Sequence, residues 1–200
     1  MCGIAGVIMK SGDADPDILD RLAAALDAGQ GLAHTRLAII DLETGDQPLR
    51  DAAGNVLIAN GEIYNFVELR EEIGAGEFQT KSDCEVALPL LVRHGPEFSA
   101  TLRGMYAIAA IESDAGRTYL ARDPFGIKPL YYVEDAAGVY FASEPKALFA
   151  AGITAPKLNG LARDEFLQLQ FTSGPETIYQ GVRRVLPGET LTVVAGRVTG

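Results

Sequence analysis

The chain begins with Met-Cys-Gly-Ile-Ala-Gly-Val-Ile-Met (residues 1–9), an apolar segment with a cysteine at its second position. The β-branched residues Ile4, Val7 and Ile8 predict a buried strand over Gly3–Met9, because short apolar runs of this composition are typical of strands. A strand at this point would hold a preceding thiol rigidly, whereas most chain termini are frayed.

Removal of Met1 would give Cys2 a thiol and a free α-amine on one residue. The reference pKa values are about 7.7–8.0 for the amine and about 8.5 for the thiol, so a base and a nucleophile would coexist near neutral pH. Such an amine can act as general base for its own side chain. The chain has only two histidines, His34 and His94, which disfavours a Cys–His pair. Met-Cys alone is nevertheless more often an accident of sequence than a catalytic signal.

Composition indicates one globular domain over residues 1–200, since 48% of the residues are hydrophobic and 22% are charged. The formal net charge of −10 disfavours a nucleic-acid partner and an anionic membrane surface. No apolar run reaches the roughly 20 residues of a membrane span, and no signal peptide is recognisable. We therefore expect a cytoplasmic protein.

The pattern of apolar residues predicts many short strands and a few helices, which suits an α+β sandwich. Helices are expected from Asp15 or Pro16 to Gly29, at Phe66–Ile73, from Asp83 to Gly95, from Ser143 or Glu144 onward, and at Asp164–Phe171. Further strands are expected at Leu32–Leu42, Val56–Asn60, Met105–Ile111, Arg117–Ala121, Pro129–Val133 and Val139–Ala142. A terminal hairpin is expected from Glu189–Val194 and Arg197–Thr199.

Cysteine usage disfavours a metal site. Cys2 and Cys84 are the only cysteines, and we expect both to be free thiols in a cytoplasmic chain. No CxxC or HExxH motif accompanies them, so neither a structural nor a catalytic zinc site is expected.

Seven segments carry a family resemblance by their joint order. Together they resemble the glutaminase domain of class II (N-terminal nucleophile) glutamine amidotransferases, and within that family the glutamine-hydrolysing asparagine synthetases. The resemblance runs from Cys2 to about Gly188, and it implies a four-layer αββα sandwich of two mainly antiparallel sheets. The segments are MCGIAGV (1–7), AHTRLAIIDLETGDQPL (33–49), NGEIYN (60–65), SDCEV (82–86), GMYAIA (104–109), RDPFGIKPLYY (122–132) and SEPKAL (143–148).

The resemblance implies catalytic roles for three residues. Cys2 would attack the side-chain amide of glutamine, form a γ-glutamyl thioester and release ammonia. Asn60 and Gly61 would form the oxyanion hole, through the Asn side-chain amide and the Gly backbone N–H. A neutral amide and a backbone without a Cβ can both approach a developing negative charge closely.

Five further residues are implied as substrate contacts. Arg36 would bind the α-carboxylate of glutamine, for which a bidentate guanidinium is well suited. Asp83 and Glu62 would bind the α-ammonium group, and Ile39 and Ile40 would line the pocket. L-Glutamine is therefore the expected substrate.

Without the resemblance, the same residues have ordinary structural interpretations. Arg36 would be a surface residue of a strand, and Asp83 would cap the helix that follows it. Asn60-Gly61 is the commonest dipeptide of tight hairpin turns. Only their occurrence together in the family's order favours function.

The sequence departs from the family at two places. An Arg-Gly-Pro-Asp-type segment is missing near residues 27–31, where the chain is shorter by about 15–20 residues than a helix and loop require. No phosphate loop of an ATP-pyrophosphatase domain follows, so we expect a fragment of a synthetase, or a subunit that passes ammonia to one. No cofactor is expected in this domain, and ATP and Mg only in the absent synthetase domain. The resemblance also allows a homodimer.

Two other functions stay open at this point. The domain could be a degenerate, non-catalytic structural or regulatory relative, which the missing segment favours. It could also be an N-terminal-nucleophile amidohydrolase of another substrate, although Arg36, Glu62 and Asp83 suit a free α-amino acid better.

Overall fold

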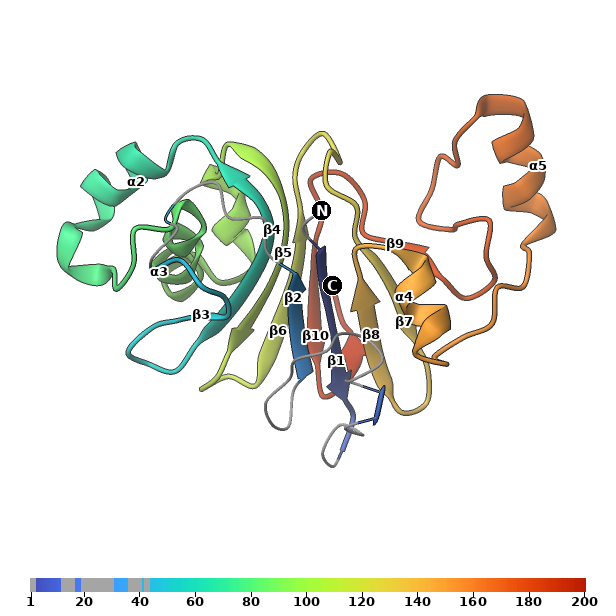
Figure 1. Ribbon diagram of the computed structural model, residues 1–200, viewed down its shortest axis with the longest axis horizontal. Helices are drawn as coiled ribbons and strands as arrows, with labels where there is room; N and C mark the ends of the chain where they lie inside the picture. The colour runs from blue at the N-terminus through green and yellow to red at the C-terminus, as the bar shows by residue number, and fades with distance from the viewer. Residues whose placement is uncertain (1–2, 12–16, 19–30, 36–40, 42–43) are drawn as a thin grey trace.

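The computed structural model of the protein describes residues 3–11, 17–18, 31–35, 41 and 44–200. In these residues two antiparallel sheets pack face to face, and helices cover the outer face of each sheet (Figure 1). The five-stranded sheet has the order β2-β1-β8-β7-β9, and the six-stranded sheet has the order β11-β10-β6-β5-β4-β3. This is the α+β sandwich of two antiparallel sheets that the sequence predicted.

The elements have the following bounds. The five-stranded sheet contains β1 (Gly3–Met9), β2 (Gly31–Thr35), β7 (Tyr131–Glu134), β8 (Gly138–Ala142) and β9 (Arg183–Arg184). The six-stranded sheet contains β3 (Leu49–Arg50), β4 (Val56–Ile63), β5 (Gly104–Glu112), β6 (Arg117–Arg122), β10 (Thr190–Val194) and β11 (Arg197–Val198). The helices are α2 (Phe66–Ile73), α3 (Ala87–His94), α4 (Pro145–Ala150) and α5 (Gly160–Leu169), with 3-10 helices η1 (Ala75–Glu77), η2 (Asp83–Val86) and η3 (Gly95–Thr101).

Alternation along the strands divides the core into layers, because successive side chains of a strand point to opposite faces. In β1, Ile4 and Ile8 pack between the two sheets, whereas Ala5 and Val7 pack under α4. In β4, Ile58 lies in the inner core. Its neighbours Leu57 and Ala59 and the more distant Ile63 pack instead against the layer of α2 and α3. Each sheet is therefore buried on both faces (Figure 1).

Most predicted strands are confirmed, and Gly3–Met9 has the predicted bounds. The turn interpretation of Asn60-Gly61 is wrong, because β4 continues through both residues to Ile63 and pairs with β5 along its whole length. The helix predicted from Asp83 is divided into η2 and α3. Helix α5 begins earlier than predicted, since the Asn159 side chain accepts a hydrogen bond from the Ala162 N–H and caps it.

Two predicted elements extend beyond the described residues. The helix from Asp15 or Pro16 to Gly29 falls almost wholly on residues outside them, as does the shortened segment at 27–31. Of the strand predicted at Leu32–Leu42, residues 31–35 form β2. Within the described part of the chain, no helix has the length and apolar character of a membrane span.

A turn after β6 holds β5 in place through one buried carboxylate. Asp123 is fully buried and accepts hydrogen bonds from the backbone N–H groups of Phe125, Ile127 and Lys128 in its own turn. It also accepts one from the N–H of Tyr106 in β5, at 3.3 Å. A buried charge is tolerated only when it is satisfied in this way. The RDPFGIKPLYY segment therefore holds β5, the strand that pairs with β4.

Burial raises the pKa of Tyr106 to about 12, with a further contribution from the negative charge of Asp123. The pKa of an exposed tyrosine is about 10, so the folded state keeps a proton that the unfolded state loses above that pH. This contribution to stability is complete below about pH 10 and is lost as the pH rises from about 10 to about 12. We predict that Tyr106→Phe flattens the decline of the free energy of unfolding over this range, as measured by urea denaturation. Equal declines in both proteins would contradict the prediction.

Candidate functional site

Among the described residues, no strand lies beside one edge of β4 over its second half. β5 pairs with all of β4, whereas β3 covers only Leu57 and Val56. The N–H and C=O of alternate residues in an antiparallel strand point to the same edge. Residues 57, 59, 61 and 63 therefore direct their peptide groups away from β5, and beyond Leu57 no strand of the described residues pairs with them.

Side chains supply partners at two of these positions. The side-chain amide of Gln47 bonds to both peptide groups of Ala59: it accepts a hydrogen bond from the N–H at 2.6 Å and donates one to the C=O at 3.0 Å. Asp83 accepts a hydrogen bond from the N–H of Ile63 at 2.7 Å. Gly61 lies between them, and its C=O faces the thiol of Cys84 at 3.9 Å. By the same alternation, the Gly61 N–H points into the space between the Gln47 and Asp83 contacts.

Asn60 differs from the other buried asparagines of the chain. Asn55 and Asn65 use both the oxygen and the nitrogen of their side chains in hydrogen bonds. Asn60 is only 4% exposed, yet its side-chain amide has no hydrogen-bond partner among the described residues. Its position two residues after Ile58 places it on the face of β4 that looks toward β1. An amide that bonds to none of the described residues can bind a ligand.

Gly61 is required by a close approach of two backbones. A Cβ at this position would lie 2.1 Å from the carbonyl oxygen of Met105 and 2.6 Å from the Cα of Tyr106 in β5. No larger residue fits without moving β5, which the Asp123 turn holds. The glycine therefore serves the strand pairing, not a turn.

Asp83 is not a helix cap, contrary to the structural alternative. The residue before η2 is Ser82, and its side chain makes no capping hydrogen bond. The carboxylate of Asp83 is 5% exposed and uses Oδ2 for Ile63 and for the Cys84 thiol at 3.7 Å. No group of the described residues bonds to Oδ1. One carboxylate oxygen is thus left for another donor.

The structure brings together four of the eight predicted site residues: Asn60, Gly61, Glu62 and Asp83 lie on β4 or against its free edge. Glu62 is partly buried. It is two residues after Asn60 in β4, so the side chains of both residues lie on the face toward β1. Cys2, Arg36, Ile39 and Ile40 lie outside the described residues. The expectation that Cys2 and Cys84 are free thiols therefore stays a prediction.

The start of β1 is clamped from the other end of the chain. Ile4 donates its N–H to the Ser143 hydroxyl at 3.0 Å, and the Ser143 N–H donates to the Ile4 carbonyl at 2.8 Å. β1 in turn packs against β4 across the two sheets. The strand that follows Cys2 in sequence is thus fixed beside the strand that carries Asn60.

Gln47 and Ser143 were missed by sequence reasoning, although both belong to the family-like segments. Their partners are 12 and 139 residues away, so no local pattern indicated them. Only their positions within the family-like segments could have indicated a role for Gln47 and Ser143. The described residues contain no group of three or more side chains arranged to hold a metal ion.

A family model of the glutamine amidotransferase domain matches residues 1–199. The chain belongs to this family. The amidotransferase domain is 42% identical over 166 residues to "Asparagine synthetase [glutamine-hydrolyzing] 1" of Bacillus subtilis, an alignment that covers 82% of the chain and 26% of the relative. It is 49% identical over 120 residues to "Asparagine synthetase B [glutamine-hydrolyzing]" of Escherichia coli, which covers 58% of the chain and 22% of the relative.

A putative asparagine synthetase of Mycobacterium tuberculosis is 34% identical over 224 residues, covering 94% of the chain and 34% of the relative. The amidotransferase domain thus spans about a quarter to a third of the length of these relatives. Among solved structures, glutamine phosphoribosylpyrophosphate amidotransferase from B. subtilis matches with a TM-score of 0.67 over 99% of the chain and 48% of its own. At 22% sequence identity this likeness supports the fold alone.

The close approach at Gly61 gives a prediction about stability. We expect Gly61→Ala to lower the free energy of unfolding by at least about 2 kcal/mol, because the new methyl group must displace the backbone of β5. Gly76→Ala is the matched control, since a Cβ there meets nothing within 4 Å. Its effect should stay within about 1 kcal/mol. Urea denaturation compares the two, and equal effects would contradict the close approach.

Proposed function

We propose that this amidotransferase domain hydrolyses the side-chain amide of L-glutamine to glutamate and ammonia, with Cys2 as the nucleophile. The observation that carries the proposal is the free edge of β4. There, a buried amide and a buried carboxylate each have a hydrogen-bonding atom without a partner among the described residues, in a domain of the glutamine amidotransferase family.

The chemistry begins with removal of Met1, which exposes the α-amine of Cys2. The amine takes the thiol proton, and the thiolate attacks the side-chain amide carbon of glutamine. The tetrahedral intermediate collapses, the proton passes to the leaving nitrogen, and ammonia departs from a γ-glutamyl thioester. Water then cleaves the thioester, which releases glutamate and restores the thiol.

Asn60 and Gly61 would stabilise the oxyanion of that intermediate. The side-chain amide of Asn60 and the N–H of Gly61 are neutral donors on β4, which β5 holds in place, and the Asp123 turn in its turn holds β5. Donors fixed before the reaction stabilise developing charge without reorganisation.

The amino-acid part of glutamine would be recognised by charge. Asp83 would accept a hydrogen bond from the α-ammonium group on its second oxygen, and Glu62 of β4 would bind the same group. Arg36 would bind the α-carboxylate, and Ile39 and Ile40 would line the pocket. This arrangement of one cation and two anions selects a free α-amino acid over a peptide or an acyl amide.

The ammonia would be passed to a synthetase domain or subunit that activates a carboxylate with ATP and Mg, as the names of the relatives suggest. The glutaminase step itself needs no cofactor. A single domain over residues 1–200, a cytoplasmic location and a homodimer stay predictions of the sequence.

The proposal predicts that the purified chain forms glutamate and ammonia from glutamine, and that Cys2→Ala abolishes both products. Asn60→Ala should lower kcat by about 10²–10³-fold, since one oxyanion donor is lost. Asn159→Ala is the matched control, because Asn159 caps the distant helix α5. Its kcat should equal that of the wild type.

Coupled assays for glutamate and ammonia provide the measurement. Glutamate formation that is equal in the wild type and in Cys2→Ala would contradict the proposal. A wild-type chain without turnover would favour a non-catalytic relative of the family.

A further inference from the structure

Glu85 is a buried carboxylate that the proposed reaction leaves unused. It lies two residues after Asp83 in η2, and only 2% of its surface is exposed. Removing a carboxylate from water is costly unless charge and hydrogen bonds compensate for it. Glu85 is therefore expected to have several hydrogen-bond donors and a positive charge near it.

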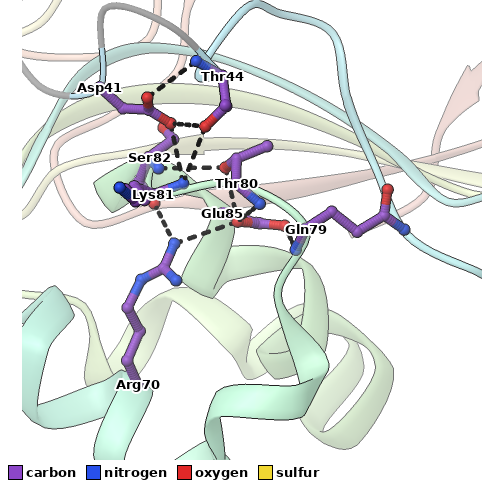
Figure 2. A network of polar contacts seen from close by, with 8 residues as sticks. All are labelled: Asp41, Thr44, Arg70, Gln79, Thr80, Lys81, Ser82 and Glu85. Atoms are coloured by element: carbon purple, nitrogen blue, oxygen red, sulfur yellow. Dashed lines mark hydrogen bonds and ion pairs between the residues drawn. The ribbon is translucent and has the colours of Figure 1, made fainter.

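Four donors converge on Glu85 (Figure 2). Its Oε1 accepts from the N–H of Gln79 at 2.6 Å, and its Oε2 accepts from the N–H and the hydroxyl of Thr80 at 3.0 and 2.6 Å. Arg70 of α2 completes the set with an ion pair at 3.1 Å. Glu85 thus organises the loop that leads to Asp83.

The same network holds both peptide groups of Ser82, the residue before Asp83. The Ser82 N–H donates to the Thr80 hydroxyl at 3.1 Å, and the Ser82 carbonyl accepts from Arg70 at 2.7 Å. Both of these partners are themselves bound to Glu85. The direction in which the chain enters Asp83 is therefore set by Glu85 and its partners (Figure 2).

A second carboxylate ties this loop to the segment after Ile40. Asp41 accepts from the N–H of Lys81 at 2.8 Å and from the N–H of Thr44 at 2.9 Å. Asp41 has a φ of 53°, in the left-handed region that short polar side chains tolerate best. Arg36, Ile39 and Ile40 precede Asp41 directly in sequence, so this contact joins the Asp83 loop to the chain that carries the other predicted substrate residues.

We propose that Glu85 is a positioning residue for glutamine binding: with Arg70 it fixes the loop of residues 79–82 so that Asp83 meets the α-ammonium group of the substrate. The Asp41–Lys81 contact supports the same loop from its other side. This inference rests on the proposed function. It assigns Glu85 no contact with the substrate and no part in the cleavage step.

A positioning role and a merely structural role differ in which kinetic constant changes. Loss of the loop geometry should weaken contacts made through the α-ammonium group and leave Cys2, Asn60 and Gly61 as they are. The KM for glutamine then rises while kcat stays nearly constant. Glutaramate, which is glutamine without its α-amino group, has nothing for Asp83 to bind and should be insensitive to the change.

The test compares Glu85→Gln with the wild type, using glutamine and glutaramate as substrates. The Glu85→Gln side chain turns an NH₂ group toward either the Gln79 donor or the Thr80 donors, which an acceptor must face. It also removes the negative charge that pairs with Arg70. We expect a rise of at least about tenfold in the KM for glutamine, with kcat within about threefold, and no change for glutaramate. Asp83→Asn should show the same pattern, and the double variant should be no worse than the more impaired single variant.

Two further variants keep the test decisive. Asp41→Ala, which removes the support from the other side, should raise the KM for glutamine by a smaller factor even if Glu85→Gln does not fold. Glu176→Gln is the control, because it breaks the exposed ion pair with Arg183 and should change neither constant.

Equal losses with glutamine and glutaramate, or an unchanged KM for glutamine in a folded Glu85→Gln, would overturn the positioning role and leave the proposed function standing. Titration of glutamine into Cys2→Ala with and without Glu85→Gln gives the affinity without turnover. Equal affinities in that background also overturn the positioning role. A wild-type chain that neither hydrolyses nor binds glutamine would remove both proposals.

Discussion

In the part of the chain that the structure describes, β4 is paired along its whole length on one side and only at Leu57 and Val56 on the other, so its remaining peptide groups need other partners. A buried peptide group without a hydrogen bond costs free energy, and this constraint decides what surrounds the strand. The Gln47 side chain accepts a hydrogen bond from the N–H of Ala59, and the Asp83 side chain accepts one from the N–H of Ile63. The N–H of Gly61 lies between these two contacts. This edge of β4 is thus where the domain gathers polar groups.

The rest of the fold keeps this edge in place. The turn around Asp123 fixes β5, and β5 fixes β4 through their full-length pairing. On the opposite sheet, Ser143 holds the start of β1, the strand that directly follows Cys2 in sequence. Rigid strands hold reacting groups more accurately than loops do. The family membership supports one chemistry, the hydrolysis of glutamine. The amide of Asn60 and one carboxylate oxygen of Asp83, which bond to no other described residue, fit it.

Much of this fold was predictable because strand and helix periodicities are local. β1, β4, β5 and β8 were found from alternating or apolar runs, and the site residues on β4 from the NGEIYN segment. Local preference failed where a distant strand decides the outcome: Asn-Gly favours a turn, but pairing with β5 keeps both residues in β4. The partners of Gln47, Asp83 and Ser143 lie 12, 20 and 139 residues away, and no sequence pattern predicts contacts at such separations.

The most direct test of the central claim is to identify the residue that reacts with a glutamine analogue carrying a chloroketone in place of the side-chain amide. Intact mass spectrometry followed by peptide mapping would show the site of attachment. We expect a single adduct on Cys2 in a chain that has lost Met1, and we expect L-glutamine to protect the chain from labelling. A chain that retains Met1, or an adduct on Cys84 with Cys2 unmodified, would contradict it.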